Sequence, residues 1–224
     1  LSDRVTVLRD GRLVSVLEGE KITPAEIIRL MIGRELTEDE SHHRMVKKEG
    51  EVVLEVKNLY AEGKLQDVSF KVHKGEVLGF GGLVGSGRTE LMRAIYGIDP
   101  YDSGEIAYLG KSYKPTVEKS IAGGYGFVPE ERRLQGIMGA ISITGNIGIA
   151  NLDSISGSLG FVSDAKELER ASKAISTLNI KPANPDHLVG NLSGGNQQKV
   201  VVGKWLIRDL KLLIVDEPTV GVDI

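Results

Sequence analysis

Alternating apolar and polar residues open the chain and predict a β-hairpin. Two such runs, Val5 to Leu8 and Arg12 to Val16, flank Asp10 and Gly11, a pair that favours tight turns between strands. A helical pattern follows from Pro24 to Ile32. A capping threonine precedes it, proline takes its first position, and a glutamate lies three residues after the threonine. The chain is therefore expected to begin with a hairpin and one helix.

Residues 35–51 are charged and show no apolar period, which is typical of a linker. After them the pattern predicts strands that alternate with helices. The predicted strands are Val52 to Val56, Leu65 to Val72, Glu76 to Phe80, Glu105 to Leu109, Tyr125 to Val128 and Leu212 to Val215. The predicted helices are Thr89 to Tyr96 and Ala165 to Leu178. This alternation indicates an α/β fold with a parallel sheet.

A mostly helical insert is expected between Val128 and the last predicted strand. Its clearest helix places Leu168, Ala171, Ile175 and Leu178 on one face, as an amphipathic helix requires. Residues 134–160 are rich in Gly, Ser and Ile and give no regular element. The insert is therefore predicted as a region but only partly resolved into helices.

The composition excludes several classes of protein. The net charge is −3 and no cysteine occurs, so neither an electrostatic grip on nucleic acid nor disulfide or thiolate chemistry is expected. No apolar run approaches the roughly 20 residues that cross a bilayer. No signal peptide opens the chain. We therefore expect no nucleic-acid partner, and a membrane role only through another protein.

A glycine-rich segment after the strand at Glu76 to Phe80 matches the phosphate-loop pattern G-x-x-x-x-G-K-[ST] at all positions but one. It reads Gly82-Leu83-Val84-Gly85-Ser86-Gly87-Arg88-Thr89, with Arg88 where a lysine is expected. Glycines let backbone N–H groups turn around a phosphate, and the helix N-terminus attracts anions. Thr89 would place its hydroxyl on Mg²⁺. A glycine-rich turn without a ligand is the alternative that this motif alone leaves open.

Two carboxylates end the last predicted strand, in the segment from Leu213 to Thr219. Asp216 is expected to bind Mg²⁺ through water, and Glu217 to orient or deprotonate the water that attacks a phosphate. A strand that merely ends in an acidic turn is the structural alternative. It does not account for the phosphate-loop pattern upstream.

A third motif, LSGGNQQK at Leu192 to Lys199, resembles the LSGGQ signature of ATP-binding cassettes and lies shortly before the Asp216 strand. Ser193 and the N–H groups of Gly194 and Gly195 begin a helix and so form an anion site. In that family this site caps the γ-phosphate held by the opposite cassette. The resemblance implies a phosphate-loop NTPase (RecA-like) core of parallel strands, an antiparallel β subdomain and an α-helical subdomain.

The resemblance also implies ATP and Mg²⁺ as cofactors and assigns site residues by motif. The nucleotide-binding residues would be Gly82, Gly85, Ser86, Gly87, Arg88, Thr89, Glu90, Glu130, Ser193, Gly194, Gly195 and Asn196. Thr89 and Asp216 would bind the metal, and Glu217 would be catalytic. Tyr60 is left open between adenine stacking and packing, and Trp205 is expected in the core.

A closer resemblance is to the second half of the ATPases that serve ribose, galactose and xylose importers, which carry two cassettes in one chain. It rests on Gly85 to Leu91, Val128 to Arg133 and the Asn-Gln-Gln end of the signature. The first cassette of those proteins ends in a hairpin similar to Asp3 to Gly11. Residues 1–50 are thus expected to be the tail of a first cassette plus linker. Residues 51–224 would be a second nucleotide-binding domain, truncated soon after the Asp216 strand.

This likeness implies partners and a place in the cell. The signature would serve the first cassette of the same polypeptide or a dimer mate. A transmembrane permease would dock near Arg132 to Ile149, with Ile137, Met138 and Ile141 as candidates for lining the groove. The protein would then be peripheral, at the cytoplasmic face of the cell membrane.

Three departures from a working cassette leave two functions open. Arg88 replaces the lysine, Glu130 stands where most cassettes have a glutamine, and the chain ends at Ile224, before the histidine that would sense the γ-phosphate. The chain is either an ATPase half of a sugar importer or a degenerate, non-hydrolysing cassette that supplies its signature to the first. A DNA-acting cassette is rejected, because no long coiled-coil insertion separates Thr89 from Leu192.

Overall fold

The computed structural model describes residues 2–9, 12–32, 50–157 and 160–217, and the chain forms two compact units. One unit lies within residues 1–45, and the other lies within residues 46–223. The predicted turn at Asp10 and Gly11, the helix stop at Gly33 and most of the predicted linker, residues 35–49, lie outside the described residues.

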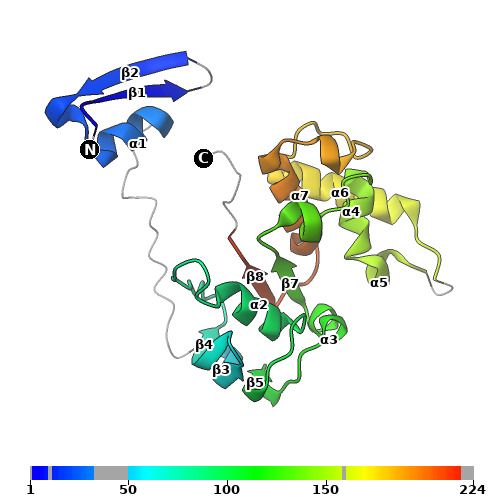
Figure 1. The fold of residues 1–224 in the computed structure, drawn as a ribbon. Coiled ribbons are helices and arrows are strands. Elements are labelled where there is room, and N and C mark those ends of the chain that lie inside the picture. Colours follow the sequence, from blue (N-terminus) through cyan, green and yellow to red (C-terminus); the bar gives the residue numbers. More distant parts are fainter. Residues whose placement is uncertain (1, 10–11, 33–49, 158–159, 218–224) are drawn as a thin grey trace. The chain divides into compact units, whose positions relative to one another are not determined.

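The first unit is a two-stranded antiparallel sheet with a helix, which confirms the prediction (Figure 1). Its elements in chain order are β1 (Arg4–Arg9), β2 (Arg12–Glu18), the 3-10 helix η1 (Gly19–Lys21) and α1 (Pro24–Ile32). The hydroxyl of Thr23 accepts a hydrogen bond from the amide of Glu26 at 3.2 Å, which caps the start of α1. Val7 and Leu17 are buried, one on each strand.

The second unit contains an antiparallel sheet and a parallel pair of strands. The antiparallel strands, in order across the sheet, are β4 (Leu65–His73), β3 (Val52–Ala61), β5 (Ser103–Tyr108) and β6 (Lys111–Ser112). The parallel pair consists of β7 (Tyr125–Val128) and β8 (Leu212–Val215). The predicted strand Glu105 to Leu109 was expected in a parallel sheet, but β5 runs antiparallel to β3, with Leu54 opposite Tyr108. Gly104 permits this close approach, because a Cβ there would lie 2.6 Å from the carbonyl oxygen of Asn58.

Residues 76–80 do not form a strand, so that prediction is wrong for the described residues. Their apolar run predicted a buried parallel strand, yet the segment joins no sheet in the described part of the chain, and Val77 is 95% exposed. Strand geometry is stabilised by hydrogen bonds to a neighbouring strand, and no described strand is hydrogen-bonded to this segment as a sheet neighbour. Phe80 still packs on the core, where its ring meets that of Phe70 edge-on at 5.0 Å.

Two helices pack with the sheets and complete the main core. They are α2 (Arg88–Tyr96) and α3 (Val117–Ala122). As predicted, α2 stops at Gly97, whose φ of +88° suits glycine. Leu59 of β3, Ile95 of α2, Ile106 of β5 and Tyr125 of β7 share one buried cluster. This cluster fixes α2, and therefore the loop before it, against both sheets.

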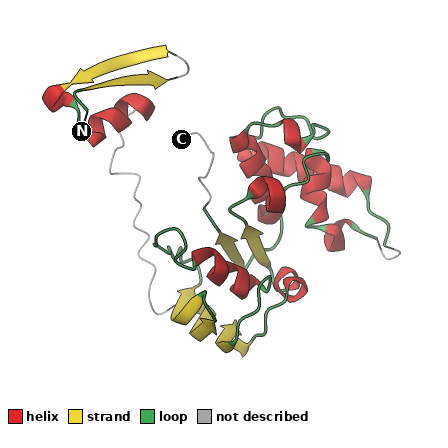
Figure 2. Ribbon diagram, in the orientation of Figure 1, coloured by secondary structure: helices red, strands yellow, loops and turns green. Residues whose placement is uncertain are grey.

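The remaining helices form a region of their own within the second unit (Figure 2). They are the π-helix η3 (Arg132–Gly136), α4 (Ile143–Ile149), α5 (Leu152–Ile155), α6 (Asp164–Leu178), the 3-10 helix η4 (Val189–Asn191) and α7 (Gly194–Leu206). The predicted helical insert is therefore confirmed, and α4 and α5 fall in the stretch that the sequence left unassigned. On α6, Ala171 and Ile175 are buried as predicted, but Leu168 is 48% exposed, because α4 and α7 cover the face beginning at Ala171.

The second unit is thus an α/β structure, as predicted. Its helical region is joined to the parallel pair through α7, which contacts β7, and Val201 and Trp205 of α7 are buried with Val128. None of the described helices is long and apolar enough to cross a membrane.

Candidate functional site

The predicted phosphate loop leads directly into α2. Gly85 and Gly87 have φ of +80° and +89°, a region that favours glycine. At Gly87 a side chain is also excluded by space, because a Cβ would lie 2.6 Å from the carbonyl oxygen of Lys64. Gly82, Gly85 and Ser86 are exposed, whereas Arg88, Thr89 and Glu90 are half-buried in the first turn of α2. The loop therefore presents its backbone to solvent at a helix N-terminus, as an anion site requires.

Arg88 reaches from the loop to the end of β8. Its Cδ lies beside Gly82, 3.6 Å from the place that a Cβ would occupy there. Its guanidinium Nη1 lies 2.7 Å from Oε1 of Glu217, and both side chains are about one-third exposed, 30% and 33%. The structure thus brings together two of the predicted site residues that are far apart in sequence.

Asp216 follows β8 and is held at the carboxyl edge of the parallel pair. Its amide donates to the carbonyl of Val128 at 2.9 Å, which continues the β7–β8 ladder. The side chain is buried, and its Oδ2 has no hydrogen-bond partner among the described residues. A buried carboxylate oxygen that accepts no hydrogen bond can coordinate a cation. The site therefore fits Mg²⁺ at Asp216.

Glu130 also lies just after the carboxyl end of a strand of the parallel pair. Because Val128 pairs with Val215 in parallel register, Glu130 follows β7 where Glu217 follows β8. Glu130 is exposed, and Glu217 has a φ of +44°, which is unusual for a residue with a side chain. Among the described residues no group of three or more His, Asp or Glu side chains is placed to hold a metal. A cation here would need oxygens from water or phosphate, as Mg²⁺ commonly takes.

A cavity of about 720 Å³ adjoins these groups. Its walls include residues 73–80 and 210–217, and most of its lining is apolar. Arg88, Asp216 and Glu217 are also part of the lining and supply most of its charge near β8. Arg88, Lys74 and Lys211 supply the positive charge of the lining, and a phosphate group requires such cations and donors. Residues 193–196 are absent from the lining, so the signature does not share this cavity.

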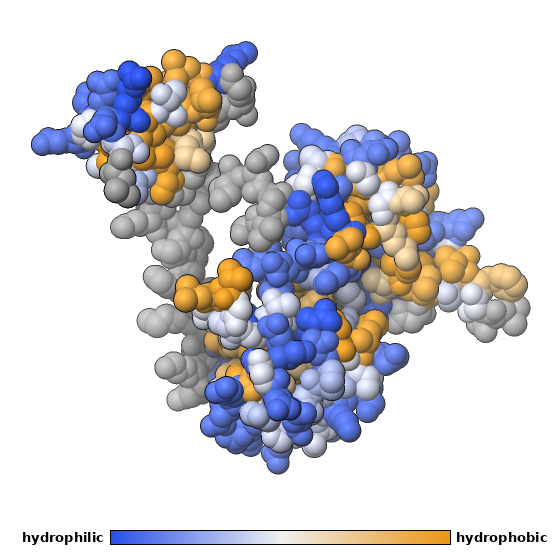
Figure 3. Space-filling model, in the orientation of Figure 1, coloured by the Kyte–Doolittle hydropathy of each residue, from blue (hydrophilic) through white to orange (hydrophobic). Residues whose placement is uncertain are grey.

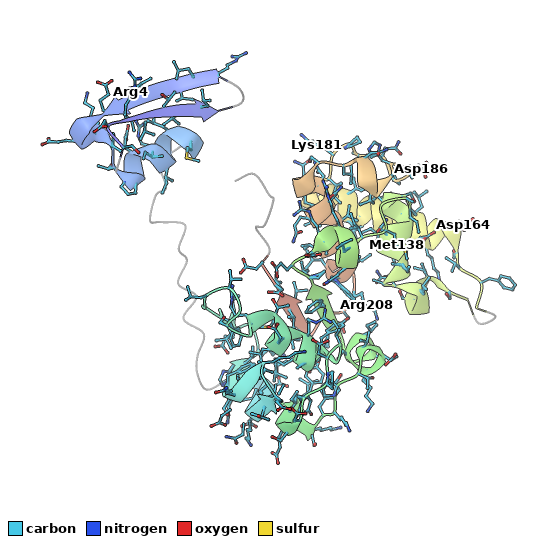
Figure 4. The ribbon with its side chains drawn as sticks, in the orientation of Figure 1. Arg4, Met138, Asp164, Lys181, Asp186 and Arg208 are labelled. Carbon is cyan, nitrogen blue, oxygen red and sulfur yellow. The ribbon has the colours of Figure 1, made fainter. Side chains whose placement is uncertain are left out.

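The signature begins α7, as predicted. Ser193 is its N-cap residue, with an extended backbone. The side chain of Asn196 donates to the hydroxyl of Ser193 at 2.9 Å and accepts from the amide of Lys181 at 2.8 Å (Lys181 is labelled in Figure 4). Asn196, predicted to bind nucleotide, is therefore engaged within the chain and fixes Ser193. Gly194 and Gly195 are half-buried in the first turn.

Gln197 is a structural residue that the sequence did not single out. Its buried side-chain nitrogen donates to the carbonyls of Val189 and Leu192, at 3.3 and 3.2 Å, and so holds the segment before the signature. Its oxygen accepts from Nε of Arg133 at 3.3 Å, which joins α7 to η3. In the sequence, a glutamine after the signature glycines shows no pattern that distinguishes a buried, hydrogen-bonded side chain from one that faces solvent.

The two aromatic residues considered in the sequence lie in different surroundings. Trp205 is 7% exposed and packs with Val128 and Val201, which confirms its place in the core. Tyr60 lies on β3, is 41% exposed and does not line the cavity. Whether Tyr60 stacks on adenine therefore stays a prediction.

Solved structures with this fold are ATP-binding cassettes. An ABC-transporter cassette in its ADP conformation superposes with a TM-score of 0.64 at 23% identity, covering 77% of this chain and 71% of that chain. A dimeric post-hydrolysis cassette bound to ADP and Pi gives 0.63 at 20% identity, with 76% of each chain covered. At these identities the likeness shows the fold, which is that of a cassette ATPase.

Sequence comparison gives the family. The model described as "ABC transporter" matches residues 65–220, a span that includes the phosphate loop, the signature and both carboxylates. This chain belongs to the ABC transporter family.

Relatives that match along the whole chain are named as sugar import proteins. The ribose import ATP-binding protein RbsA 1 of Rubrobacter xylanophilus is 42% identical over 225 residues, which is 100% of this chain and 44% of that protein. The galactose/methyl galactoside import ATP-binding protein MglA of Fusobacterium nucleatum is 41% identical over 231 residues, covering 100% and 45%. RbsA of Bacillus subtilis is 41% identical over 225 residues, again covering 100% and 45%. The chain spans less than half the length of the curated relatives it matches.

Proposed function

We propose that this chain is the second ATP-binding cassette of a sugar importer, in which ATP binding and hydrolysis by the intact protein drive transport. The observation that carries the proposal is the likeness of 41–42% to ribose and galactose import proteins along the whole chain. Coverage of 44–45% of those proteins fits one cassette of a duplicated chain. Under this proposal residues 1–50 are the tail of the first cassette with a linker, and residues 51–224 are the second.

The phosphate loop would hold the nucleotide. Backbone N–H groups between Gly82 and Thr89 would face the phosphates, because Gly85 and Gly87 allow the turns and α2 begins directly after them. Arg88 would donate to the phosphate oxygens through its planar fork. Glu90 lies in the first turn of the same helix. The position of Arg88 in the cavity wall supports this role.

Thr89 and Asp216 would hold Mg²⁺, which would neutralise the phosphate charge when bound. Asp216 suits this role because one of its buried oxygens lacks a donor. Glu217, the next residue, would accept a hydrogen bond from the attacking water and orient it. Glu130 lies at the same strand edge and would add negative charge there.

The signature would act on a second cassette, either in the same polypeptide or in a dimer mate. Ser193, Gly194 and Gly195 open a helix of 13 residues and are not part of the cavity that holds Arg88 and Asp216. A helix N-terminus with a serine hydroxyl suits a terminal phosphate presented from outside. Asn196 and Gln197 would keep this end rigid through their internal hydrogen bonds.

A degenerate cassette that serves mainly as the signature donor is the second candidate. The specific observation in its favour is the Arg88–Glu217 ion pair. In this pair the arginine of the phosphate loop binds the carboxylate that should orient water. Glu130 at the neighbouring strand end adds a further negative charge where a neutral glutamine is usual. Under this reading the first cassette hydrolyses ATP and this one contributes Ser193 to Gly195.

A permease would dock near residues 132–149. The buried side chain of Asn146 accepts from the amide of Met138 at 2.8 Å and donates to the carbonyls of Met138 and Ile141 at 3.0 and 3.2 Å. These bonds fix the backbone so that Met138 and Ile141 are 49% and 39% exposed (Figure 4 labels Met138).

Leu134 is 81% exposed, whereas Ile137 packs inward. Apolar surface over the helical region is visible in Figure 3. Such a platform suits an apolar helix from a membrane subunit, which would make the protein peripheral at the cytoplasmic face.

Two measurements test the proposal. ATP–Mg²⁺ should bind weakly to the purified chain, and phosphate release at saturating ATP should be undetectable, as in a Glu217→Gln control. Turnover of about 1 s⁻¹ that vanished in the control would show a working site. It would overturn the second candidate, in which this cassette mainly donates its signature to the first. In the intact protein with its permease, Gly194→Asp should abolish uptake of ribose or galactose, whereas Arg88→Ala should only reduce it. Unchanged uptake with Gly194→Asp would contradict the proposed function.

A further inference from the structure

The side chain of Arg88 bridges the two halves of the candidate nucleotide site. It starts at the first residue of α2, passes Gly82 with its Cδ, and ends in an ion pair with Glu217 at 2.7 Å. One group that should contact phosphate and one that should orient water are therefore bonded to each other. In this arrangement Nη1 of Arg88 and Oε1 of Glu217 are engaged with each other rather than with a ligand.

The loop also contains a hydrogen bond between two of its own backbone groups. The amide of Ser86, one of the N–H groups expected to face a phosphate, donates to the carbonyl of Leu83 at 3.1 Å. The hydroxyl of Ser86 lies over Gly82, 2.4 Å from the place that a Cβ would take there. The backbone bond therefore engages an N–H group that a nucleotide would need.

We propose that the Arg88–Glu217 ion pair is an autoinhibitory contact, so that nucleotide binds this cassette only after Glu217 releases Arg88. The inference rests on the proposed nucleotide-binding function and adds a regulatory step to it. Anionic phosphate and the Glu217 carboxylate compete for the same guanidinium fork, because each forms charge-assisted hydrogen bonds with it. Arginine suits such a contact better than lysine, because the N–H donors of its planar guanidinium fit the geometry of a carboxylate.

The pair is weak enough to be displaced by a ligand. Both side chains are about one-third exposed, so water screens their attraction. Pairs of this kind change an equilibrium by up to about fivefold. A bound nucleotide, which offers several phosphate oxygens, can exceed this. The contact would therefore lower affinity by a modest factor.

The test measures ADP affinity in EDTA, so that neither metal binding nor hydrolysis enters the result. Glu217→Gln should tighten ADP binding about three- to fivefold by releasing Arg88. Asp99→Asn is the matched control, because it removes an ion pair of 2.8 Å to Arg93 at the other end of the same helix. The control should leave ADP affinity unchanged, and thermal unfolding would verify that all variants fold.

A double-mutant cycle separates the contact from simple repulsion between Glu217 and phosphate. In an Arg88→Gln background Glu217→Gln should change ADP affinity by less than about twofold, because no cation is left to release. An effect of equal size in both backgrounds, or no tightening with Arg88 present, would overturn the autoinhibitory contact while leaving nucleotide binding intact. Failure of the proposed function would differ: no variant would bind ADP, and the contact would then inhibit nothing.

Discussion

Nζ of Lys204 donates a hydrogen bond to the carbonyl oxygen of Gly136 at 2.5 Å, and so ties the signature helix α7 to the end of η3. Gln197, two turns earlier on α7, accepts from Arg133 in the same η3 segment. The signature helix and the segment after β7 are therefore fixed to each other at two points. A movement of either element would therefore displace the other.

The Lys204 contact has a consequence for stability against pH. Burial lowers the pKa of Lys204 to about 8, so the unfolded chain binds more protons between that pH and the ordinary pKa of lysine, about 10.4. Stability should then rise with pH in this window, while the neutral amine still donates to Gly136. Relative to Lys204→Met, the wild-type free energy of unfolding should increase by about 1 kcal/mol from pH 7 to pH 9. Urea denaturation of both proteins measures it, and parallel pH profiles would contradict the burial of this amine.

Replacement of Gly87 should destabilise the chain more than replacement of Gly85. Both residues have positive φ, but a Cβ at Gly87 would lie 2.6 Å from the Lys64 carbonyl, whereas one at Gly85 meets nothing within 4 Å. We expect Gly87→Ala to cost about 2–3 kcal/mol and Gly85→Ala about 1 kcal/mol. Equal losses in denaturation experiments would show that steric contact with Lys64 does not fix the loop.

Gln197→Leu should destabilise the helical region. The substitution removes the side-chain donor to the carbonyls of Val189 and Leu192. Val189 keeps a bond from the amide of Leu192, but the carbonyl of Leu192 loses its donor, and an unsatisfied buried group costs about 1–3 kcal/mol. Gln198→Leu, at the next and half-buried position, provides the control and should change stability by less than ~0.5 kcal/mol. The free energy of unfolding would be compared for the two variants. A larger loss for Gln198→Leu would refute the assigned role of Gln197.

Met138→Asp should abolish sugar transport by the intact protein without changing nucleotide binding. A charge at this 49% exposed position would oppose docking of an apolar permease helix, while the Asn146 bonds to the Met138 backbone remain. Leu168→Asp, with similar exposure on α6, is the matched control and should transport normally. Loss of nucleotide binding in the Met138 variant would instead indicate an internal role.

Local sequence determined much of this protein. The hairpin, α1, α2, α6, β7 and β8 follow from apolar period, turn residues and caps, all of which act within a few residues. The positions of Arg88, Asp216, Glu217 and Ser193 in their motifs were also readable, because each motif is a short run. The helices of residues 134–160 were not, since Gly, Ser and Ile in that stretch show no period. Packing orders them instead: α4 packs on α6 and α7, and α5 contacts α4.

Tertiary structure alone decided which of these groups meet. A strand exists only beside a partner, so the apolar run at residues 76–80 could not by itself form one, and β5 joined the antiparallel sheet through its contact with β3. Arg88 and Glu217 are separated by more than half the chain and become neighbours because α2 and β8 pack around one core. The sequence therefore specified the chemical groups of the site. The long-range packing of its elements specified their distances.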